Sequence, residues 1–284
     1  MLRVRQRPEA ARLLDDRDRA AALAVCATDP VANVFVASRI RALGLEPGRL
    51  GAQLWGFEQS GQLTSLCYAG ANLVPVQATP AAVAAFAERA LRQGRRCSSL
   101  VGPSAALAEL WGYLRPHWGP PRDVRASQPL MAIDGPAQIA ADPGVRRVRS
   151  DEIDVLLPAC IAMFTEEVGV SPLIGDGGAA YRARVAELIR AGRAFARIED
   201  GRVIFKAEVG AATSQACQVQ GVWVRPEFRG RGLAAPGMAA VVTEARRAIA
   251  PVVSLYVNDF NAPARAAYQR TGFRQVGEFM SVLF

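Results

Sequence analysis

One short stretch constrains the fold of this chain more than any other, the run Arg229–Gly230–Arg231–Gly232–Leu233–Ala234. An apolar run at 219–224 precedes it, and a helix-compatible stretch at 238–249 follows it. Glycines admit backbone angles that other residues avoid, and the first N–H groups of a helix lack partners within the helix. The order of strand, glycine-rich turn and helix therefore predicts an anion-binding turn, which the two arginines would reinforce.

The neighbouring residues exclude two familiar phosphate-binding turns. No Gly-Lys-Ser/Thr follows, so the magnesium-binding hydroxyl of a P-loop is missing. The third position of a dinucleotide-binding G-x-G-x-x-G turn falls on Ala235, and no βαβ unit with a downstream acid follows. Taken alone, the stretch could also be an ordinary solvated turn in an arginine-rich chain.

A second motif follows downstream, with the pattern Asn-x-x-Ala-x-x-x-Tyr-x-x-x-Gly-Phe. It consists of Asn261, Ala264, Tyr268, Gly272 and Phe273. Together with Arg-x-x-Gly-x-Ala at 229–234, it resembles the cofactor site of the GNAT (GCN5-related) N-acetyltransferases. The resemblance covers roughly residues 145–284. The whole chain is similar to actinobacterial members of this family that carry an extra, uncharacterised N-terminal domain.

Length and composition indicate a globular protein of one or two domains. The 284 residues are 51% hydrophobic, which is enough for substantial cores, yet no run of eighteen apolar residues occurs. The basic N-terminus, residues 1–7, lacks the apolar segment of a signal peptide. We therefore expect a cytoplasmic protein without a membrane partner.

Cysteine, histidine and charge argue against several classes of site. The five cysteines are scattered and form no Cys-x-x-Cys pair, which favours neither a disulfide framework nor a zinc site. The single histidine, His117, argues against histidine triads and metal sites, so we expect no metal. The net charge of +8 comes from dispersed arginines, Lys206 being the only lysine, so we expect no nucleic-acid partner.

The first half of the chain is predicted to alternate helices and short strands. Thr79 as N-cap and Pro80 at the first helical position mark one helix start, and Gly94 marks its end. The expected elements are helices over 8–28 and 33–45, strands at 53–57, 63–68 and 72–76, a helix over 80–93, a strand at 98–101, a helix over 104–115 and a strand at 130–133.

The second half repeats this order. Pro236 is tolerated in a first helical turn, which predicts that the helix after the glycine-rich turn begins near Gly232 or Leu233. The expected elements are a strand at 145–148, helices over 151–168 and 179–191, strands at 194–199, 203–209 and 217–224, the helix ending at 249, a strand at 252–256, a helix over 262–270 and a strand at 279–283.

The repeated order predicts a tandem α+β protein with α/β/α layers. We expect a GNAT acyltransferase fold over 145–284 and a degenerate GNAT-like domain over 1–134, joined by a linker at 135–144. The turn at 77–80 corresponds to the glycine-rich turn but has neither glycine nor arginine, so the first domain would have lost the phosphate cradle. A single domain is the alternative.

The resemblance implies acetyl-CoA or another short acyl-CoA as co-substrate. Its pantetheine arm would pair with a strand backbone, and its pyrophosphate would lie on the glycine-rich turn. Trp223 is expected above all to pack in the strand core, and Asn261 is expected first to cap the helix over 262–270. The implied cofactor-binding residues are Val222, Trp223, Val224, Arg229, Gly230, Arg231, Gly232, Leu233, Ala234 and Asn261.

Tyr268 occupies the position of the family's general acid, and a tyrosine with an ordinary pKa near 10 is protonated at neutral pH. Packing beneath the site is the alternative for this ring. The base is less defined, because Gln218 and Gln220 stand where the family often has a glutamate. Glu208, beside Lys206 on the preceding strand, is the catalytic candidate, and a structural ion pair or a solvated face is its alternative. Further options are a relayed water or the carboxylates at 166–167.

Glu166 and Glu167 are expected to border the acceptor groove, where carboxylates suit a cationic amine; an exposed helix end is their alternative. We thus predict direct acyl transfer to a primary amine of a small molecule or a protein. The alternative function is a catalytically weak acyl-CoA-binding sensor or interaction module. The sequence leaves open the acceptor's identity and whether the chain forms a homodimer.

Overall fold

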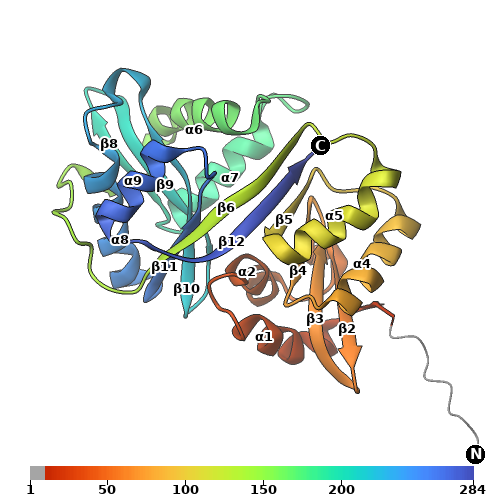
Figure 1. The fold of residues 1–284 in the computed structure, drawn as a ribbon. Coiled ribbons are helices and arrows are strands. Elements are labelled where there is room, and N and C mark those ends of the chain that lie inside the picture. The colour runs from red at the N-terminus through yellow and green to blue at the C-terminus, as the bar shows by residue number, and fades with distance from the viewer. Residues whose placement is uncertain (1–9) are drawn as a thin grey trace, which may run out of the picture. The chain divides into compact units, whose positions relative to one another are not determined.

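The structure, a computed structural model, describes residues 10–284, which divide into two compact units. Unit 1 comprises the described residues up to Leu130 together with Val276–Phe284, and unit 2 comprises Met131–Gln275. Figure 1 labels the elements of both units. No helix within residues 10–284 is long and apolar enough to span a bilayer.

Unit 1 is built on a sheet with the strand order β1-β2-β3-β4-β5-β12, in which only β4 and β5 pair in parallel. Its elements are β1 (Arg12–Leu13), η1 (Asp16–Asp18), α1 (Arg19–Ala27), α2 (Val34–Leu43), α3 (Pro47–Leu50), β2 (Gln53–Gln59), β3 (Gln62–Ala69), β4 (Asn72–Val76), α4 (Pro80–Gln93), β5 (Ser99–Pro103), α5 (Ser104–Trp118), most of β6 (Asp123–Ile133) and most of β12 (Arg274–Leu283).

Unit 2 repeats this plan with the strand order β11-β10-β9-β8-β7, in which only β10 and β11 pair in parallel. Its elements are β7 (Val145–Arg147), η2 (Ser150–Glu152), α6 (Ile153–Val168), α7 (Ala179–Arg190), β8 (Ala194–Glu199), β9 (Arg202–Ala212), β10 (Ala216–Val224), η3 (Pro226–Phe228), α8 (Ala234–Ala248), β11 (Val252–Tyr256) and α9 (Ala262–Thr271).

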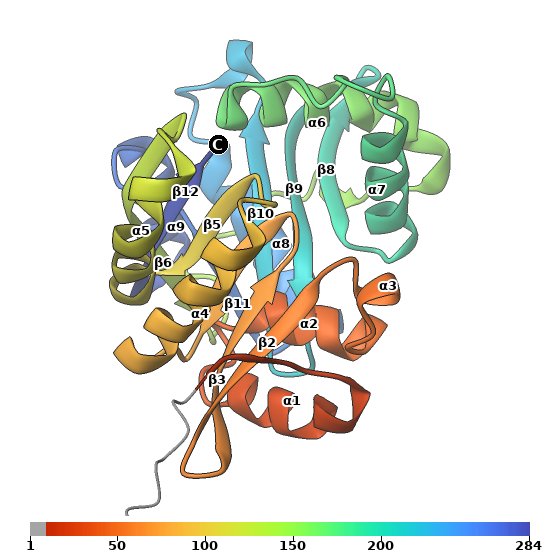
Figure 2. The same cartoon turned by 90° about the vertical axis from the view of Figure 1, so that its right-hand side faces the viewer.

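Each sheet separates two cores because successive strand residues point to opposite faces. In unit 2, Phe195 and Phe205 pack against α8, while Ala194 and Val203 belong to the core under α6 and α7. Figure 2 shows α6 and α7 beside β8 and β9. In unit 1, Trp55 packs with α4 and α5, and its neighbour in the chain, Leu54, packs with α1 and α2. The predicted α/β/α layering is therefore present in both units.

The predicted helix over 8–28 is wrong in its first part. Residues 8 and 9 lie outside the described residues, and the helix α1 begins only at Arg19. Asp15 and Asp18 form a capping box at the 3₁₀ turn η1, and Arg12 pairs with Gly56 of β2. Local capping and strand pairing satisfy this backbone in place of a longer helix.

The last strand joins the two halves of the sequence in an unexpected way. Residues 279–283 of β12 pair with 99–103 of β5, so the C-terminal strand completes the sheet of unit 1. Conversely, residues 131–133 of β6 belong to unit 2. Both strands are also longer than their apolar runs indicated, since β6 begins at Asp123 and β12 at Arg274. Apolar periodicity predicts the central part of a strand, whereas the ends of a strand depend on the neighbouring strands with which it pairs.

Replacing a buried valine of β12 tests its place in the core of unit 1. Val282 is 0% exposed and packs in the core under α4 and α5. The substitution Val282→Ala should lower the free energy of unfolding by about 2 kcal/mol, because it leaves a cavity. Urea unfolding followed by circular dichroism measures this change. Val276→Ala, on the same strand at an exposed position, is the matched control and should cost far less; equal costs would contradict the assignment.

Candidate functional site

A pocket forms where β10 parts from β11. The parallel pairing of the two strands ends at Gln218–Ser254, whereas β10 continues to Val224 and pairs with β9 up to Phe205. The edge of β10 beyond Gln218 therefore turns backbone N–H and C=O groups toward a gap rather than toward a neighbouring strand. Such an edge can accept an extended ligand as an added strand.

A β-bulge shapes this edge. The register with β9 shifts between Gln220 and Trp223, and Gly221 between them has φ +59°. A Cβ at this position would lie 2.9 Å from Met163 Cε and 3.0 Å from Lys206 Nζ. Both the left-handed backbone and the close neighbours require glycine here, so the bulge is a built feature that re-aims the strand at the pocket.

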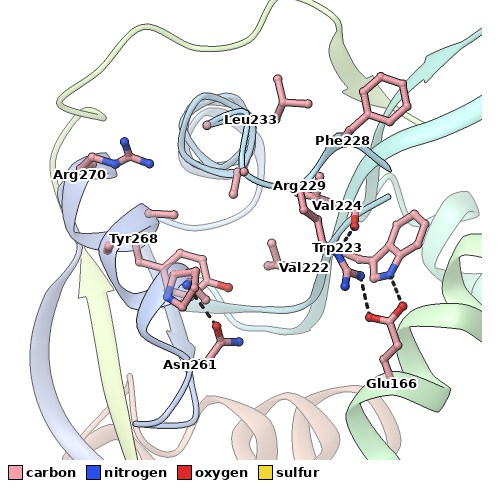
Figure 3. Close-up of a pocket in the computed structure, with 17 residues that line it drawn as sticks. Glu166, Val222, Trp223, Val224, Phe228, Arg229, Leu233, Asn261, Tyr268 and Arg270 are labelled. Carbon is pink, nitrogen blue, oxygen red and sulfur yellow. Dashed lines mark hydrogen bonds and ion pairs between the residues drawn. The ribbon is translucent and has the colours of Figure 1, made fainter. Parts of the chain in front are cut away.

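The pocket has a volume of about 860 Å³, within the range of small-molecule sites. Figure 3 shows Tyr268 and Asn261 on one side, Trp223, Val224 and Arg229 on the other, and Val222 between them. The lining residues are Glu166, Val222, Trp223, Val224, Phe228, Arg229, Gly230, Gly232, Leu233, Ala234, Asn261, Pro263, Ala264, Ala266, Ala267, Tyr268 and Arg270. All the cofactor-binding residues expected from the sequence are among them except Arg231.

The N-terminus of α8 gives one end of the pocket an anion-binding character. Gly230 and Gly232 have φ of +75° and +76°, which bends the turn into the helix. Leu233, the N-cap, makes no capping bond with its side chain, and Pro236 has no N–H. The first amides of α8 therefore lack partners within the helix and face the turn with the positive end of its dipole. The helix begins at Ala234 with Leu233 as its N-cap, next to the start predicted near Gly232 or Leu233.

Arg229 and Glu166 form a bridge across the pocket edge. The Arg229 guanidinium donates from Nε to the Val224 carbonyl oxygen at 2.9 Å and from Nη2 to Glu166 Oε2 at 2.7 Å. Trp223 donates from Nε1 to Glu166 Oε1 at 3.2 Å. Both charged side chains are about half exposed, so solvent screens their pairing. Glu166 thus reaches the pocket as the partner of two residues from the cofactor-binding group.

Arg231 lies elsewhere. Its guanidinium stacks over the Phe228 ring at 4.9 Å from the centroid and donates to the Glu227 carbonyl oxygen at 3.0 Å. Phe228 itself lines the pocket, so Arg231 supports the turn from outside the lining.

The helix α9 contributes the opposite wall. Asn261 accepts a hydrogen bond from the Ala264 N–H at 3.2 Å, which confirms it as the N-cap of α9. Tyr268 lines the pocket and is 7% exposed. Burial raises the pKa of its hydroxyl, and the nearby negative charge of Glu167 raises it further. Tyr268 is therefore protonated at neutral pH and can donate a proton. Glu167 acts on this site through its charge and is not among the lining residues.

Glu208 lies in a buried polar cluster behind the bulge. Lys206 donates to Glu208 Oε2 at 3.2 Å, and Gln220 donates to Glu208 Oε1 at 2.9 Å. Burial alone would lower the pKa of Lys206, but Glu208 and Cys160 outweigh it and raise the pKa, so the lysine is charged. Glu208 is the counter-ion of this buried charge and does not line the pocket.

Several lining residues carry no signal in the two sequence motifs, namely Phe228, Pro263, Ala266, Ala267 and Arg270. The helical repeat could have found Ala267, because residues three and four apart share a face, as Ala264, Ala267 and Tyr268 do on α9. Nothing comparable marks Phe228, which enters the pocket through the turn that precedes the glycines.

Comparison with known sequences gives two family matches. Residues 178–273 match the model of the acetyltransferase (GNAT) family, and residues 52–156 match a domain of unknown function (DUF4081). Unit 2 is therefore similar to the acetyltransferase (GNAT) family over residues 178–273. The match includes both the glycine-rich turn and Tyr268. A search of curated proteins gave no match.

Solved structures extend the likeness of the GNAT fold to nearly the whole chain. A tandem GNAT protein from the clavulanic acid biosynthesis pathway is 16% identical, with a TM-score of 0.57 over 95% of this chain and 97% of its own. A GCN5-related N-acetyltransferase from Sphaerobacter thermophilus is 16% identical, with a TM-score of 0.57 over 96% of this chain and 94% of its own. A GNAT-family acetyltransferase from Colwellia psychrerythraea is 13% identical, with a TM-score of 0.56 over 96% of this chain and 99% of its own. At these identities the likeness concerns the fold, and it agrees with the predicted tandem arrangement.

Removing the charge of Glu166 tests its bridge to Arg229. Glu166→Gln should free the Arg229 guanidinium and raise the affinity for coenzyme A by about threefold, because an exposed ion pair is a modest competitor. Isothermal titration calorimetry measures the affinity. Asp154→Asn is the matched control, since Asp154 lies on the same helix but pairs with Arg182 and not with the pocket lining. A weaker affinity in Glu166→Gln than in the control would contradict the bridge as a competitor.

Proposed function

We propose that this chain is an acyl-CoA-dependent N-acyltransferase that moves an acyl group, most simply acetyl, to a primary amine. One observation carries the proposal: a single pocket joins the free edge of β10 to the uncapped N-terminus of α8. A long ligand with an amide-bearing arm and an anionic pyrophosphate matches both ends of that pocket.

In this proposal the backbone of residues 222–224 pairs with the pantetheine amides, as an added strand would. The amides of residues 230–235 hold the pyrophosphate oxygens at the positive end of α8. Arg229 contributes charge after exchanging Glu166 for the pyrophosphate, whose oxygens suit the fork of a guanidinium. The thioester then points toward Tyr268 on the opposite wall.

The chemistry needs no covalent enzyme intermediate. The amine nitrogen attacks the thioester carbonyl carbon, a C–N bond forms and the C–S bond breaks. The thiolate of coenzyme A leaves and receives the Tyr268 hydroxyl proton, and the nitrogen loses one proton to water. Tyr268 regains its proton from solvent before the next cycle. The raised pKa keeps Tyr268 in its donor form over the whole neutral range.

The acceptor must arrive in a form that can attack. Glu166, the acid in the pocket lining, is paired with Arg229, and Glu208 is held by Lys206 and Gln220. We propose that a water relay, rather than direct contact with either carboxylate, takes the proton of the amine. The negative charge of Glu167 near Tyr268 favours a cationic acceptor, in a small molecule or in a protein.

The engagement of both carboxylates also favours a second candidate function. An acyl-CoA-binding module with little turnover would keep the pocket and the anion-binding turn but would not need a free base. The two candidates predict the same cofactor affinity and differ in turnover.

A charged side chain in the turn tests cofactor binding. Gly232→Glu should abolish binding of acetyl-CoA, because it places a carboxylate where the pyrophosphate would lie; calorimetry with acetyl-CoA measures this. Gly201→Glu is the matched control, because Gly201 has a similar φ of +70° and open space around it but lies in the β8–β9 turn. Full binding by Gly232→Glu would contradict the proposed site.

A conservative change at Tyr268 separates the two candidate functions. In Tyr268→Phe, kcat should fall by roughly 100-fold or more, because the leaving thiolate loses its proton donor, while the Kd for acetyl-CoA stays within about twofold. Steady-state assays with a panel of amines, alongside calorimetry, provide both numbers. Because the pKa of Tyr268 is raised, the wild-type rate should show no fall near pH 10 from this group. Unchanged turnover would remove Tyr268 from the chemistry, and wild-type binding without turnover would favour the module.

A further inference from the structure

Unit 1 contains a cavity of its own, independent of the site proposed above. Its volume is about 450 Å³, and it lies where β2 begins, β3 turns into β4, and α4 and α5 end. This is the C-terminal end of α4, the opposite end from the turn at 77–80 that corresponds to the glycine-rich turn of unit 2. The residues that the argument uses are Gln53, Trp55, Gln93, Arg96 and Trp118.

A fixed polar group forms one wall of this cavity. The amide oxygen of Gln53 accepts from Trp55 Nε1 at 2.8 Å and from Gln93 Nε2 at 3.0 Å. These two bonds use the acceptor capacity of Gln53 and fix the orientation of its amide. The Nε2 of Gln53 therefore remains as a positioned donor beside the indole of Trp55, which Arg89 holds from 5.4 Å by a cation–π contact.

A second donor has no partner. Trp118 Nε1 is covered by protein atoms, and no acceptor among the described residues bonds to it. A buried N–H without a partner is destabilising, so it marks a position where an acceptor belongs. The ring packs edge-on against Phe284, is only partly buried as a residue and lines the cavity.

Charge defines the head group that would fit. Arg96 lines the cavity, is exposed and forms no ion pair within the described residues, and no lining residue is acidic. The C-termini of α4 and α5 each contribute about half a negative charge, which the full positive charge of Arg96 balances. The side chains thus offer donors from Gln53, Trp118 and Arg96, a set that suits a carboxylate.

We propose that this cavity binds a small aromatic carboxylate. The ring lies against the indoles of Trp55 and Trp118, and the carboxylate oxygens accept from Arg96, Trp118 Nε1 and the Gln53 amide. A ligand of about a dozen non-hydrogen atoms fits the volume. The cavity gives unit 1 a ligand-binding function that does not depend on acyl transfer in unit 2.

Nuclear magnetic resonance can observe this site directly, because the chain has four tryptophans and hence four indole N–H signals. The full chain labelled with ¹⁵N is titrated with phenylacetate and with its neutral analogue phenylacetamide; Trp118→Phe assigns the Trp118 signal. We expect phenylacetate to move the Trp118 signal saturably while the Trp223 signal stays in place. Phenylacetamide should bind about tenfold more weakly, because it lacks the charge.

Two arginine variants complete the test. Arg96→Gln should weaken phenylacetate binding by about tenfold, whereas Arg115→Gln, at an exposed position outside the lining, should bind as the wild type does. Both positions are exposed, so folding is preserved. The proposal is overturned if phenylacetate leaves the Trp118 signal unmoved, if the amide binds as tightly as the acid, or if Arg96→Gln and Arg115→Gln bind alike.

Discussion

The pocket of unit 2 depends on the early end of one strand pairing. After Gln218, β10 continues along β9 but leaves β11, so its backbone loses a neighbour on one side only. A strand edge without a neighbouring strand can take up a ligand with amide groups as an added strand. The bulge at Gly221, the turn at 229–234 and the wall formed by α9 all lie around this opening. The opening is thus formed in part by backbone groups of β10 and of the turn at 229–234.

The first N–H groups of a helix need hydrogen-bond partners, and the two units differ in how they treat them at the equivalent helices α4 and α8. In unit 1, Thr79 accepts a hydrogen bond from the Ala82 N–H, so the N-terminus of α4 is satisfied by its own chain. A cap of this kind is worth about 1 kcal/mol. In unit 2, Leu233 provides no such bond, and α8 leaves its amides for a ligand. The glycine-rich turn of unit 2 therefore carries a local cost in stability, and the pyrophosphate of the proposed cofactor would remove it.

Helix caps and turns could be predicted from the sequence, whereas the pairing of distant strands could not. The capping residue Thr79, the helix α4 and the cap at Asn261 follow from residues within a single turn, and each was predicted correctly. The turn at 229–234 was found for the same reason. The start of α1 at Arg19 and the pairing of β12 with β5 depend on partners far along the chain, which periodicity does not encode. The position of Arg231 over the Phe228 ring was not predicted either, because the contact depends on the three-dimensional course of the turn.

The acids near the pocket illustrate how burial decides chemistry. Glu208 is almost fully buried, and its nearest cation, Lys206, is more buried still. Separating such a pair leaves an uncompensated charge in a medium of low polarity, so Glu208 stays paired with Lys206. Glu166 is half exposed, and exchanging its partner Arg229 costs little because water screens both groups. Movement on ligand binding should therefore occur at the Glu166–Arg229 bridge, while the Lys206–Glu208 cluster keeps the bulge rigid behind it.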